Sequence, residues 1–501
     1  MPSNQEGLIA RHLQYRLLTG LLLFLFIWPA AAQKKPNIIY IYADDLGYGE
    51  LGCYGQTKIK TPNLDKLAAN GMRFTQHYSG SPVCAPSRCV LMTGIDSGRA
   101  YIRNNSPWYR KTNPHNQGQE PLKTEYTTIA ELLKKQGYRT GVAGKWGLGG
   151  PESYGVPAKH GFDDFFGYHC QWVAHSYYPD HLWHNDKKIP LNETPISGHY
   201  RFKEAPEDWS VVDGEKYAPD WIAERMLEWM GEAADSDEPF FFWYASVIPH
   251  VALHIPAEQI EKYGYEKSMD TKPYFGDKGY TPHPRPNAAY ASMITYLDEQ
   301  VGRIVKLLEE KGELDNTLII FSSDNGTTYV GGVDRNYFNS LQDLRGHKGN
   351  VFEGGIRVPM IASWPGKIKP GTTSDLISAQ VDMLPTLIDA AGGKAPEDID
   401  GVSILPTLTG KGKQTTADFY YWELGSRQAI RDGDWKLIRE FDKKQRAKTF
   451  LFNLAEDRSE QNNLADQHPD RVKALIKKII NHRTEPEVKG FRRPAFSSDK
   501  I

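Results

Sequence analysis

The chain has 501 residues, of which 40% are hydrophobic and 24% charged, and its formal net charge at pH 7 is −2. This composition is ordinary for a globular protein, and the length allows a large core and more than one domain. The near-balance of charges, without a long basic block, argues against nucleic acid as a partner.

A short apolar run near the N-terminus is typical of an export signal. Arg11 and Arg16 precede the apolar residues 17–28, and small residues follow up to Ala32. This pattern predicts a secretory signal peptide over residues 1–32, cleaved near Ala32. The run is too short to span a bilayer comfortably and no later segment could, so we predict an exported protein, periplasmic or secreted, without a membrane anchor. A retained anchor is the alternative.

The mature chain opens with a strand that ends in two acidic residues. Residues 36–45 form a β-branched and aromatic run whose last members are Asp44 and Asp45. Such a run predicts a buried strand of a parallel sheet. Ligands bind at the carboxyl edge of open α/β sheets, so we expect these carboxylates to face a ligand there. A solvated turn is the alternative, because Asp and Gly are turn residues.

A proline-containing turn places Cys84 at the start of a predicted helix. Small residues and Pro82 precede the cysteine, and Pro86 suits a first helical turn, where its missing N–H would have no partner. A side chain at position 84 would therefore meet the positive end of the helix dipole, which favours negative charge. Arg88 lies one turn further on and can point back to the same place. A reactive or buried cysteine is the alternative interpretation.

Helices and strands then alternate along the chain. We expect strands over residues 138–143, 240–246 and 317–321, preceded by amphipathic helices over 127–136, 219–231 and 288–311. This alternation predicts an α/β fold whose large mixed sheet is mostly parallel and is sandwiched by helices. The polar residues that follow these strands or glycine-rich turns are Lys145, His250, Asp324, Asn325 and Lys348.

Two segments depart from the alternation. Residues 151–217 are rich in His and Trp, so we expect a loop-rich insertion that lines a pocket for a sugar or aryl group, with a packed surface loop cluster as an equal alternative. After a linker over 409–416, short strands and a helix near 469–482 predict a small α+β domain with an antiparallel sheet. The predicted domains therefore cover residues 33–410 and 411–501.

The side chains expected at one sheet edge suggest a metal and an anion. Four oxygen donors without a Cys/His cluster call for a hard cation, and Ca²⁺ fits this donor type better than Zn²⁺, with Mg²⁺ as an alternative. Cations and an imidazole around such a metal would bind a tetrahedral oxyanion ester and stabilise its leaving oxygen. The donors are Asp44, Asp45, Asp324 and Asn325, and the other groups are Arg88, Lys145, His250 and Lys348.

Several motifs are similar to those of one enzyme family. Cys-Ala-Pro-Ser-Arg at 84–88 is similar to the Cys-x-Pro-Ser-Arg signature of the type I sulfatases, and residues 137–146 resemble their second signature. Further matching blocks are residues 38–45, Pro249-His250, Asp324-Asn325-Gly326 and residues 348–359. The chain thus resembles the arylsulfatase family of the alkaline phosphatase superfamily over nearly its whole mature length. The resemblance implies an alkaline-phosphatase-like catalytic domain over 33–410.

The resemblance also implies a nucleophile and a metal. Cys84 would be converted to Cα-formylglycine by a formylglycine-generating maturation enzyme, and the hydrated aldehyde would attack sulfur to give a sulfated enzyme intermediate. One Ca²⁺ would be held by Asp44, Asp45, Asp324, Asn325 and the formylglycine at position 84.

The cationic residues take their implied roles from the same resemblance. Arg88 would stabilise the ionised diol, and Lys145 and Lys348 would clamp the sulfate. His250, together with Lys348, would protonate or stabilise the leaving alcohol.

One position departs from the family pattern. The family commonly has a His directly after the Lys-Trp of the second signature, where it assists breakdown of the hemiacetal, and this chain has Gly147 there. His175 and His169 are the nearest candidates in sequence to replace it, and we favour His175.

The sequence therefore predicts a sulfuric ester hydrolase that acts on a sulfated carbohydrate or an aryl sulfate. A phosphonate or phosphate monoester hydrolase of the same superfamily is an alternative, because it shares the metal edge. A non-catalytic protein that binds sulfated glycans is a further alternative, supported only by Gly147.

Overall fold

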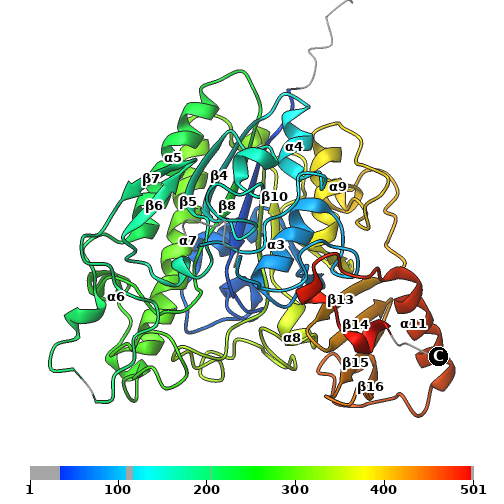
Figure 1. Cartoon of the computed structure of the whole chain (residues 1–501). Coiled ribbons are helices and arrows are strands. Elements are labelled where there is room, and N and C mark those ends of the chain that lie inside the picture. The colour runs from blue at the N-terminus through cyan, green and yellow to red at the C-terminus, as the bar shows by residue number, and fades with distance from the viewer. Residues whose placement is uncertain (1–33, 109–116, 205, 498–501) are drawn as a thin grey trace, which may run out of the picture. The chain divides into compact units, whose positions relative to one another are not determined.

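A ten-stranded mixed sheet forms the centre of the fold (Figure 1). The computed structural model describes residues 34–108, 117–204 and 206–497, and the predicted signal peptide over residues 1–32 lies outside them. Residues Pro36–Ile501 group into one compact unit. Within the described ranges, no helix combines the length and apolar character needed to cross a bilayer.

The sheet is built mainly from parallel strands. Its strands are β1 (Asn37–Ala43), β2 (Met72–Phe74), β4 (Arg139–Lys145), β5 (Asp164–Tyr168), β6 (His181–His184), β7 (Lys187–Pro190), β8 (Phe240–Ala245), β9 (Thr317–Ser323), β10 (Met360–Ser363) and β11 (Thr372–Ser374). Their order is β11-β2-β10-β9-β1-β8-β4-β5-β6-β7. Within this sheet, β10 and β6 run in the opposite direction to the other eight strands. This arrangement confirms the predicted mixed, mostly parallel sheet.

The central strand β1 separates two hydrophobic cores. Ile38 and Tyr40 belong to the core on one face of the sheet, and Ile39 and Ile41 to the core on the other. All four side chains are buried. A strand buried on both faces carries a continuous apolar run, which is why the sequence predicts this strand.

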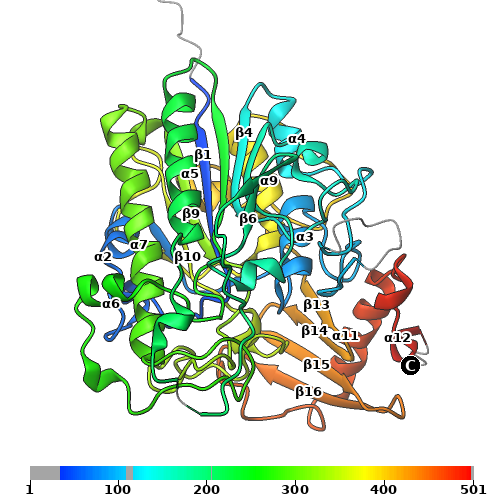
Figure 2. The ribbon, with the colours of Figure 1, turned by 60° about the vertical axis from the view of Figure 1, so that its left-hand side comes forward.

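Helices cover both faces of the sheet (Figures 1 and 2). Residues of α2, α5 and α7 pack into the core that contains Ile39, and those of α3, α4 and α9 into the core that contains Ile38. The helices are α2 (Pro62–Ala69), α3 (Cys84–Thr93), α4 (Ile129–Lys134), α5 (Ala218–Ala234), α6 (Ala257–Tyr263), α7 (Pro286–Glu310), α8 (Glu353–Ile356), α9 (Met383–Ala390), α10 (Leu405–Thr409), α11 (Pro469–His482) and α12 (Pro494–Ser497).

The segment 151–217 contains more regular structure than its sequence suggests. It supplies β5, which extends the sheet in parallel beside β4, and then β6 and β7, which continue it as an antiparallel meander. These strands are short and interrupted by glycine and charged residues, so their apolar periodicity is weak. Loops and short 3-10 helices make up most of the remainder.

A four-stranded antiparallel sheet follows residues 410–419, which hold no helix or strand. A tight hairpin turn joins Asp432 to Trp435, and α11 packs on this sheet. The strands are β13 (Tyr420–Leu424), β14 (Arg427–Asp432), β15 (Trp435–Phe441) and β16 (Ala447–Asn453), and two-residue strands β3 (His77–Tyr78) and β12 (Ser378–Ala379) pair elsewhere. The predicted antiparallel C-terminal sheet is confirmed.

This C-terminal sheet is tied to the rest of the unit by buried charges. The ammonium group of Lys436 on β15 lies 2.8 Å from Glu353 of α8 and 2.9 Å from Glu460, and all three side chains are fully buried. Buried charges are tolerated only when they are paired in this way. Because α8 closely follows Lys348, the network also anchors the loop that carries this lysine.

Candidate active site

Cys84 is the first residue of α3, so the helix start places its side chain as predicted. The extended residue Val83 precedes it, and the free N–H of Ala85 donates to Asn105 Oδ1 at 2.9 Å. The Cys84 Sγ lies 3.4 Å from Asp44 Oδ1. Burial and the nearby carboxylates raise the pKa of the Cys84 thiol. An unmodified thiol here stays protonated and is a poor nucleophile.

The oxygen donors come from two neighbouring strands. β1 pairs with β9 up to Ala43 opposite Ser323, so the residues that follow each strand meet. The N–H of Asp45 donates to Asp324 Oδ1 at 3.0 Å, and Asn325 Nδ2 donates to Asp45 Oδ1 at 2.8 Å. Asp44, Asp45, Asp324 and Asn325 are all fully buried. The structure therefore brings the four predicted donors to one point.

The chemistry of this cluster fits a divalent cation. Ligand atoms of Asp44, Asp45, Cys84 and His250 all lie within 4.8 Å of one another. The Oδ1 atom of Asn325 is buried and accepts no hydrogen bond from any described residue, so it has a vacant lone pair. Burial, assisted by the charge of Asp44, raises the pKa of Asp324 to about 7. Crowded buried carboxylates are unfavourable without a cation between them.

Three cationic side chains surround the carboxylates. Arg88 Nη2 lies 3.1 Å from Asp324 Oδ2, and Lys348 Nζ lies 2.8 Å from Asp45 Oδ2. Lys145 forms an ion pair with Asp44. Burial alone would raise the pKa of Asp44, but Lys145 and the other cations hold it well below its usual range. The site therefore keeps Asp44 ionised next to positive charges that could meet an anionic ester.

Two stacked histidines lie next to this cluster, on the side of Asp45. His250 Nε2 lies 3.7 Å from Asp45 Oδ2. The ring of His175 stacks on that of His250, and His175 Nδ1 lies 2.9 Å from His199 Nε2. Burial lowers the pKa of both His250 and His175 well below the usual range. Both rings are therefore neutral at pH 7, and each keeps an unprotonated nitrogen that can take up a proton and become an imidazolium.

The structure separates the two histidines that the sequence offered for the role at Gly147. The side chain of His169 packs against Phe165, with ring centroids 4.6 Å apart, and its Nε2 lies 3.3 Å from the carbonyl oxygen of Asn185. His175 instead contacts His250. Of the two, the structure brings only His175 into contact with the catalytic cluster.

Sequence reasoning missed the residue that fills the space beside Gly147. A Cβ placed on Gly147 would lie 2.7 Å from Nε2 of Gln171, and the backbone there has φ +76°. Gln171 is buried, and its Nε2 has no hydrogen-bond partner. The positive φ favours glycine, and the Gln171 amide occupies the volume that a larger side chain at position 147 would need. No sequence signal links the two positions, because 24 residues of chain separate them.

Aromatic rings extend from the catalytic histidines to the surface. Trp172 is 65% exposed and stacks on His199 with ring centroids 4.1 Å apart. Tyr280 contacts both His175 and His250. These rings form a path from the catalytic histidines to solvent.

Comparisons with known proteins identify the family. A model of the Sulfatase family matches residues 36–393, and a model described as N-sulphoglucosamine sulphohydrolase, C-terminal, matches residues 347–485. The chain belongs to the sulfatase family. It is an enzyme of sulfate ester hydrolysis, and its predicted relationship to the arylsulfatases is confirmed.

This sulfatase is similar to characterised enzymes over most of its length. It is 35% identical to human arylsulfatase A over 420 residues, which cover 81% of this chain and 75% of that protein. It is 29% identical to the N-acetylgalactosamine-6-O-sulfatase of Bacteroides thetaiotaomicron, covering 90% and 94% of the two chains. The crystal structure of Ps i-CgsB in complex with k-i-k-neocarrahexaose superimposes with a TM-score of 0.71 at 26% identity, over 90% of this chain and 94% of the other.

Proposed function

We propose that this sulfatase is an exported, Ca²⁺-assisted hydrolase that removes sulfate from a sulfated carbohydrate by means of a Cα-formylglycine formed from Cys84. The observation that carries the proposal is the position of Cys84. Its side chain lies at a helix start, 3.4 Å from Asp44 Oδ1, in surroundings that raise the pKa of the thiol. A hard-metal site suits an oxygen nucleophile and not a protonated thiol.

The metal would be held by oxygen donors of β1 and β9. Asp44, Asp45, Asp324 and the vacant Oδ1 of Asn325 suit Ca²⁺ in donor type and charge. The ion would polarise a sulfate oxygen and favour the ionised diol at residue 84.

The contacts of the remaining residues support the roles that we propose for them. Formylglycine supplies a gem-diol, one hydroxyl of which attacks sulfur while the second later expels sulfate and restores the aldehyde. Arg88, fully buried against Asp324, is placed to stabilise negative charge that develops at residue 84. Lys145 and Lys348 would clamp the sulfate oxygens.

Proton transfer is assigned to the stacked histidines. Lys348, which carries a proton, and the neutral His250 stand on the side of Asp45, and together they would protonate or stabilise the leaving alcohol. His175 would take the proton from the second hydroxyl, in place of the histidine that this chain lacks at Gly147. His199, 2.9 Å from His175 Nδ1, would hold the ring in position.

Two observations support a carbohydrate as the substrate. The exposed Trp172 ring and its partner His199 offer a flat apolar surface of the kind on which pyranose rings stack. The relatives also include an enzyme named for N-acetylgalactosamine 6-sulfate and a structure that holds a neocarrahexaose.

The decisive experiment combines mass spectrometry with turnover. The tryptic peptide of residues 74–88 from enzyme exported by its native host should have the mass of formylglycine at position 84, which also reports action of a maturation enzyme. Cys84→Ala should abolish hydrolysis of sulfated glycans, whereas Cys53→Ala, at a half-buried cysteine outside the cluster, should not. An intact thiol in active enzyme would contradict the proposal. Faster turnover of phosphate or phosphonate monoesters than of sulfates would favour the alternative reaction.

Export is tested separately. The exported protein should begin at residue 33, next to the expected cleavage site at Ala32. N-terminal sequencing of protein recovered outside the cytoplasm checks this, and an uncleaved terminus would contradict it.

A further inference from the structure

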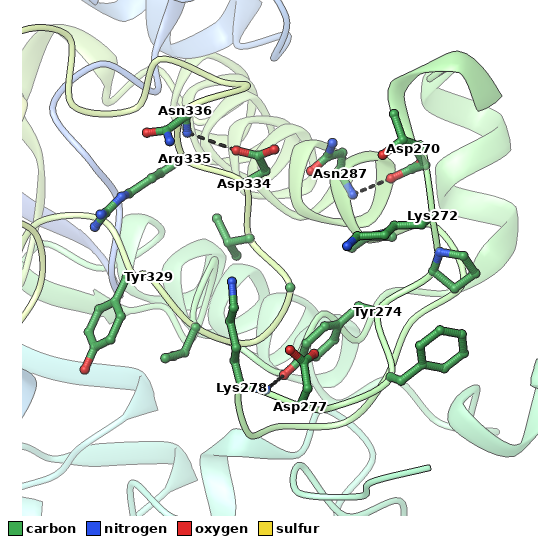
Figure 3. Close-up of a pocket in the computed structure, with 17 residues that line it drawn as sticks. Asp270, Lys272, Tyr274, Asp277, Lys278, Asn287, Tyr329, Asp334, Arg335 and Asn336 are labelled. Atoms are coloured by element: carbon green, nitrogen blue, oxygen red, sulfur yellow. Dashed lines mark hydrogen bonds between the residues drawn. The ribbon is translucent and has the colours of Figure 1, made fainter. Parts of the chain in front are cut away.

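A cavity of about 870 Å³ lies between two loops, and Figure 3 shows the side chains that line it. One wall is the loop that precedes α7, from Asp270 to Lys278, and the other is the loop of residues 329–336. This volume is within the range of cavities that hold sugar-sized ligands. None of the residues assigned to catalysis lines it.

The second wall, residues 329–336, contacts sequence neighbours of two catalytic residues. A Cβ on Gly331 would lie 2.6 Å from Val251 Cγ1, so the second loop passes over the residue that follows His250. The ring of Tyr329 lies 4.0 Å from that of His347, which precedes Lys348. A group bound in the cavity would therefore be next to the leaving-group side of the catalytic site.

Two lysines that line the cavity are available to bind a ligand. Lys272 and Lys278 are exposed, and within the described part of the chain neither makes a side-chain hydrogen bond or ion pair. Figure 3 shows both side chains pointing toward the space between the two loops. Two unpaired ammonium groups over one concave surface attract an anion.

Two of the three carboxylates that line the cavity accept hydrogen bonds from backbone N–H groups. Asp270 accepts the N–H of Asn287 at 2.6 Å, at the start of α7. Asp334 accepts the N–H groups of the two residues 336 and 337, which close its own turn. Asp277 is exposed beside Lys278. Three cations, Lys272, Lys278 and Arg335, also line the cavity, and none of their side chains has a hydrogen-bond or ion-pair partner among the described residues, so these are the groups left to meet an anion.

We propose that this cavity binds a second anionic group, a sulfate or a uronate carboxylate, carried by the sugar next to the one that is desulfated. The substrate is then an acidic oligosaccharide of at least two sugars. The inference rests on the proposed function, because it places the scissile sulfate at Cys84. Lys272 and Lys278 would hold the second anion, and the exposed Tyr329 would contact its sugar ring.

The test compares three disaccharides that share the same sulfated sugar. The neighbouring sugar carries a second sulfate in one, a uronate carboxylate in another and no charge in the third. We expect wild-type enzyme to have a lower KM for one or both doubly charged substrates, and the favoured one identifies the anion. In Lys272→Gln/Lys278→Gln this preference should fall by about tenfold through KM, and added salt should weaken it in the wild type.

A matched pair of substitutions controls for charge. Lys394→Gln/Lys477→Gln removes two exposed lysines that do not line the cavity and should keep the wild-type preference. Equal KM values for all three disaccharides, or an unchanged preference in the Lys272/Lys278 variant, would overturn the inference.

A binding measurement separates this inference from the proposed function. If the wild type hydrolyses none of the disaccharides, the proposed function fails. Calorimetry then measures binding of the same three disaccharides to full-length Cys84→Ala protein, with and without the two lysine substitutions. This measurement tests anion binding in the cavity independently of catalysis. Binding that does not weaken when the lysines are replaced would exclude it as an anion site.

Discussion

The imidazole rings of His175 and His250 stack with centroids 4.6 Å apart and planes 8° apart. They come from different parts of the chain. His250 follows β8, whereas His175 ends a short 3-10 helix, Val173–His175, in the segment 151–217. The stack puts a second neutral imidazole next to the group assigned to the leaving alcohol, and it motivates the first prediction.

His175→Ala should slow release of sulfate from the enzyme. Removing the base that takes the proton of the second hydroxyl lowers kcat by roughly 100-fold. Quenched reactions should then contain the peptide of residues 74–88 with sulfate still attached at position 84, detected by mass spectrometry. His169→Ala, whose ring packs against Phe165, is the control and should not accumulate this species. Unchanged turnover in His175→Ala would discard the assignment.

Removing the metal should lower both activity and stability. Three fully buried carboxylates then face one another with only side-chain cations between them. Free Ca²⁺ at about 100 times its Kd would add about 2.7 kcal/mol to the free energy of unfolding. Treatment with EGTA should lower Tm and turnover together, and Ca²⁺ should restore both at lower concentration than Mg²⁺. Recovery with Mg²⁺ alone would assign the site to that ion.

Gly147→His should destabilise the enzyme instead of restoring the family pattern. The left-handed backbone at φ +76° costs a non-glycine residue about 1–2 kcal/mol, and the new side chain meets Gln171. Urea unfolding of Gly147→His, Gln171→Ala and the double variant measures the coupling between the sites. The double variant should recover the part due to contact but not the part due to the backbone. Additive effects would show that the two side chains do not compete.

Lys436→Met should weaken the attachment of the C-terminal sheet. It leaves Glu353 and Glu460 buried without the ammonium group between them, and breaking a buried pair in this way costs about 3–5 kcal/mol. Urea unfolding should show this loss, whereas Lys443→Met, at an exposed turn of the same sheet, should be nearly neutral. A loss below that of the control variant would mean that the network contributes little.

Asp382 should make stability depend on pH. Burial raises the pKa of this carboxyl to about 6 in the folded protein, from 3.8. The folded state therefore binds this proton more tightly than the unfolded state does. The protonated Asp382 carboxyl adds its full contribution to the free energy of unfolding below pH 3.8, and this contribution is lost as the pH rises through 6. The loss amounts to about 3 kcal/mol. The unfolding free energy of wild type, relative to Asp382→Asn, should fall over this range. A constant difference would contradict the raised pKa.

Much of the site could be predicted because the relevant residues directly follow recognisable elements. Apolar runs such as β1 and β9 mark strands buried on both faces, and Asp44 and Asp324 follow them by one residue. The proline-containing turn marks the start of α3 at Cys84. Parallel strands bring their carboxyl ends to one edge, so local patterns were enough to place these groups together.

Other features depended on contacts between distant segments. The stacking of His175 on His250, the Gln171 side chain beside Gly147, and the cavity of Lys272 and Lys278 became visible only in the tertiary structure. Each arises where irregular loops pack against one another, and loops carry no periodicity from which a contact could be inferred. The sequence by itself thus determined the family, the sheet and the residues at its edge. The residues that surround the proposed proton-transfer groups and the proposed anion site could be identified only from the packing of the tertiary structure.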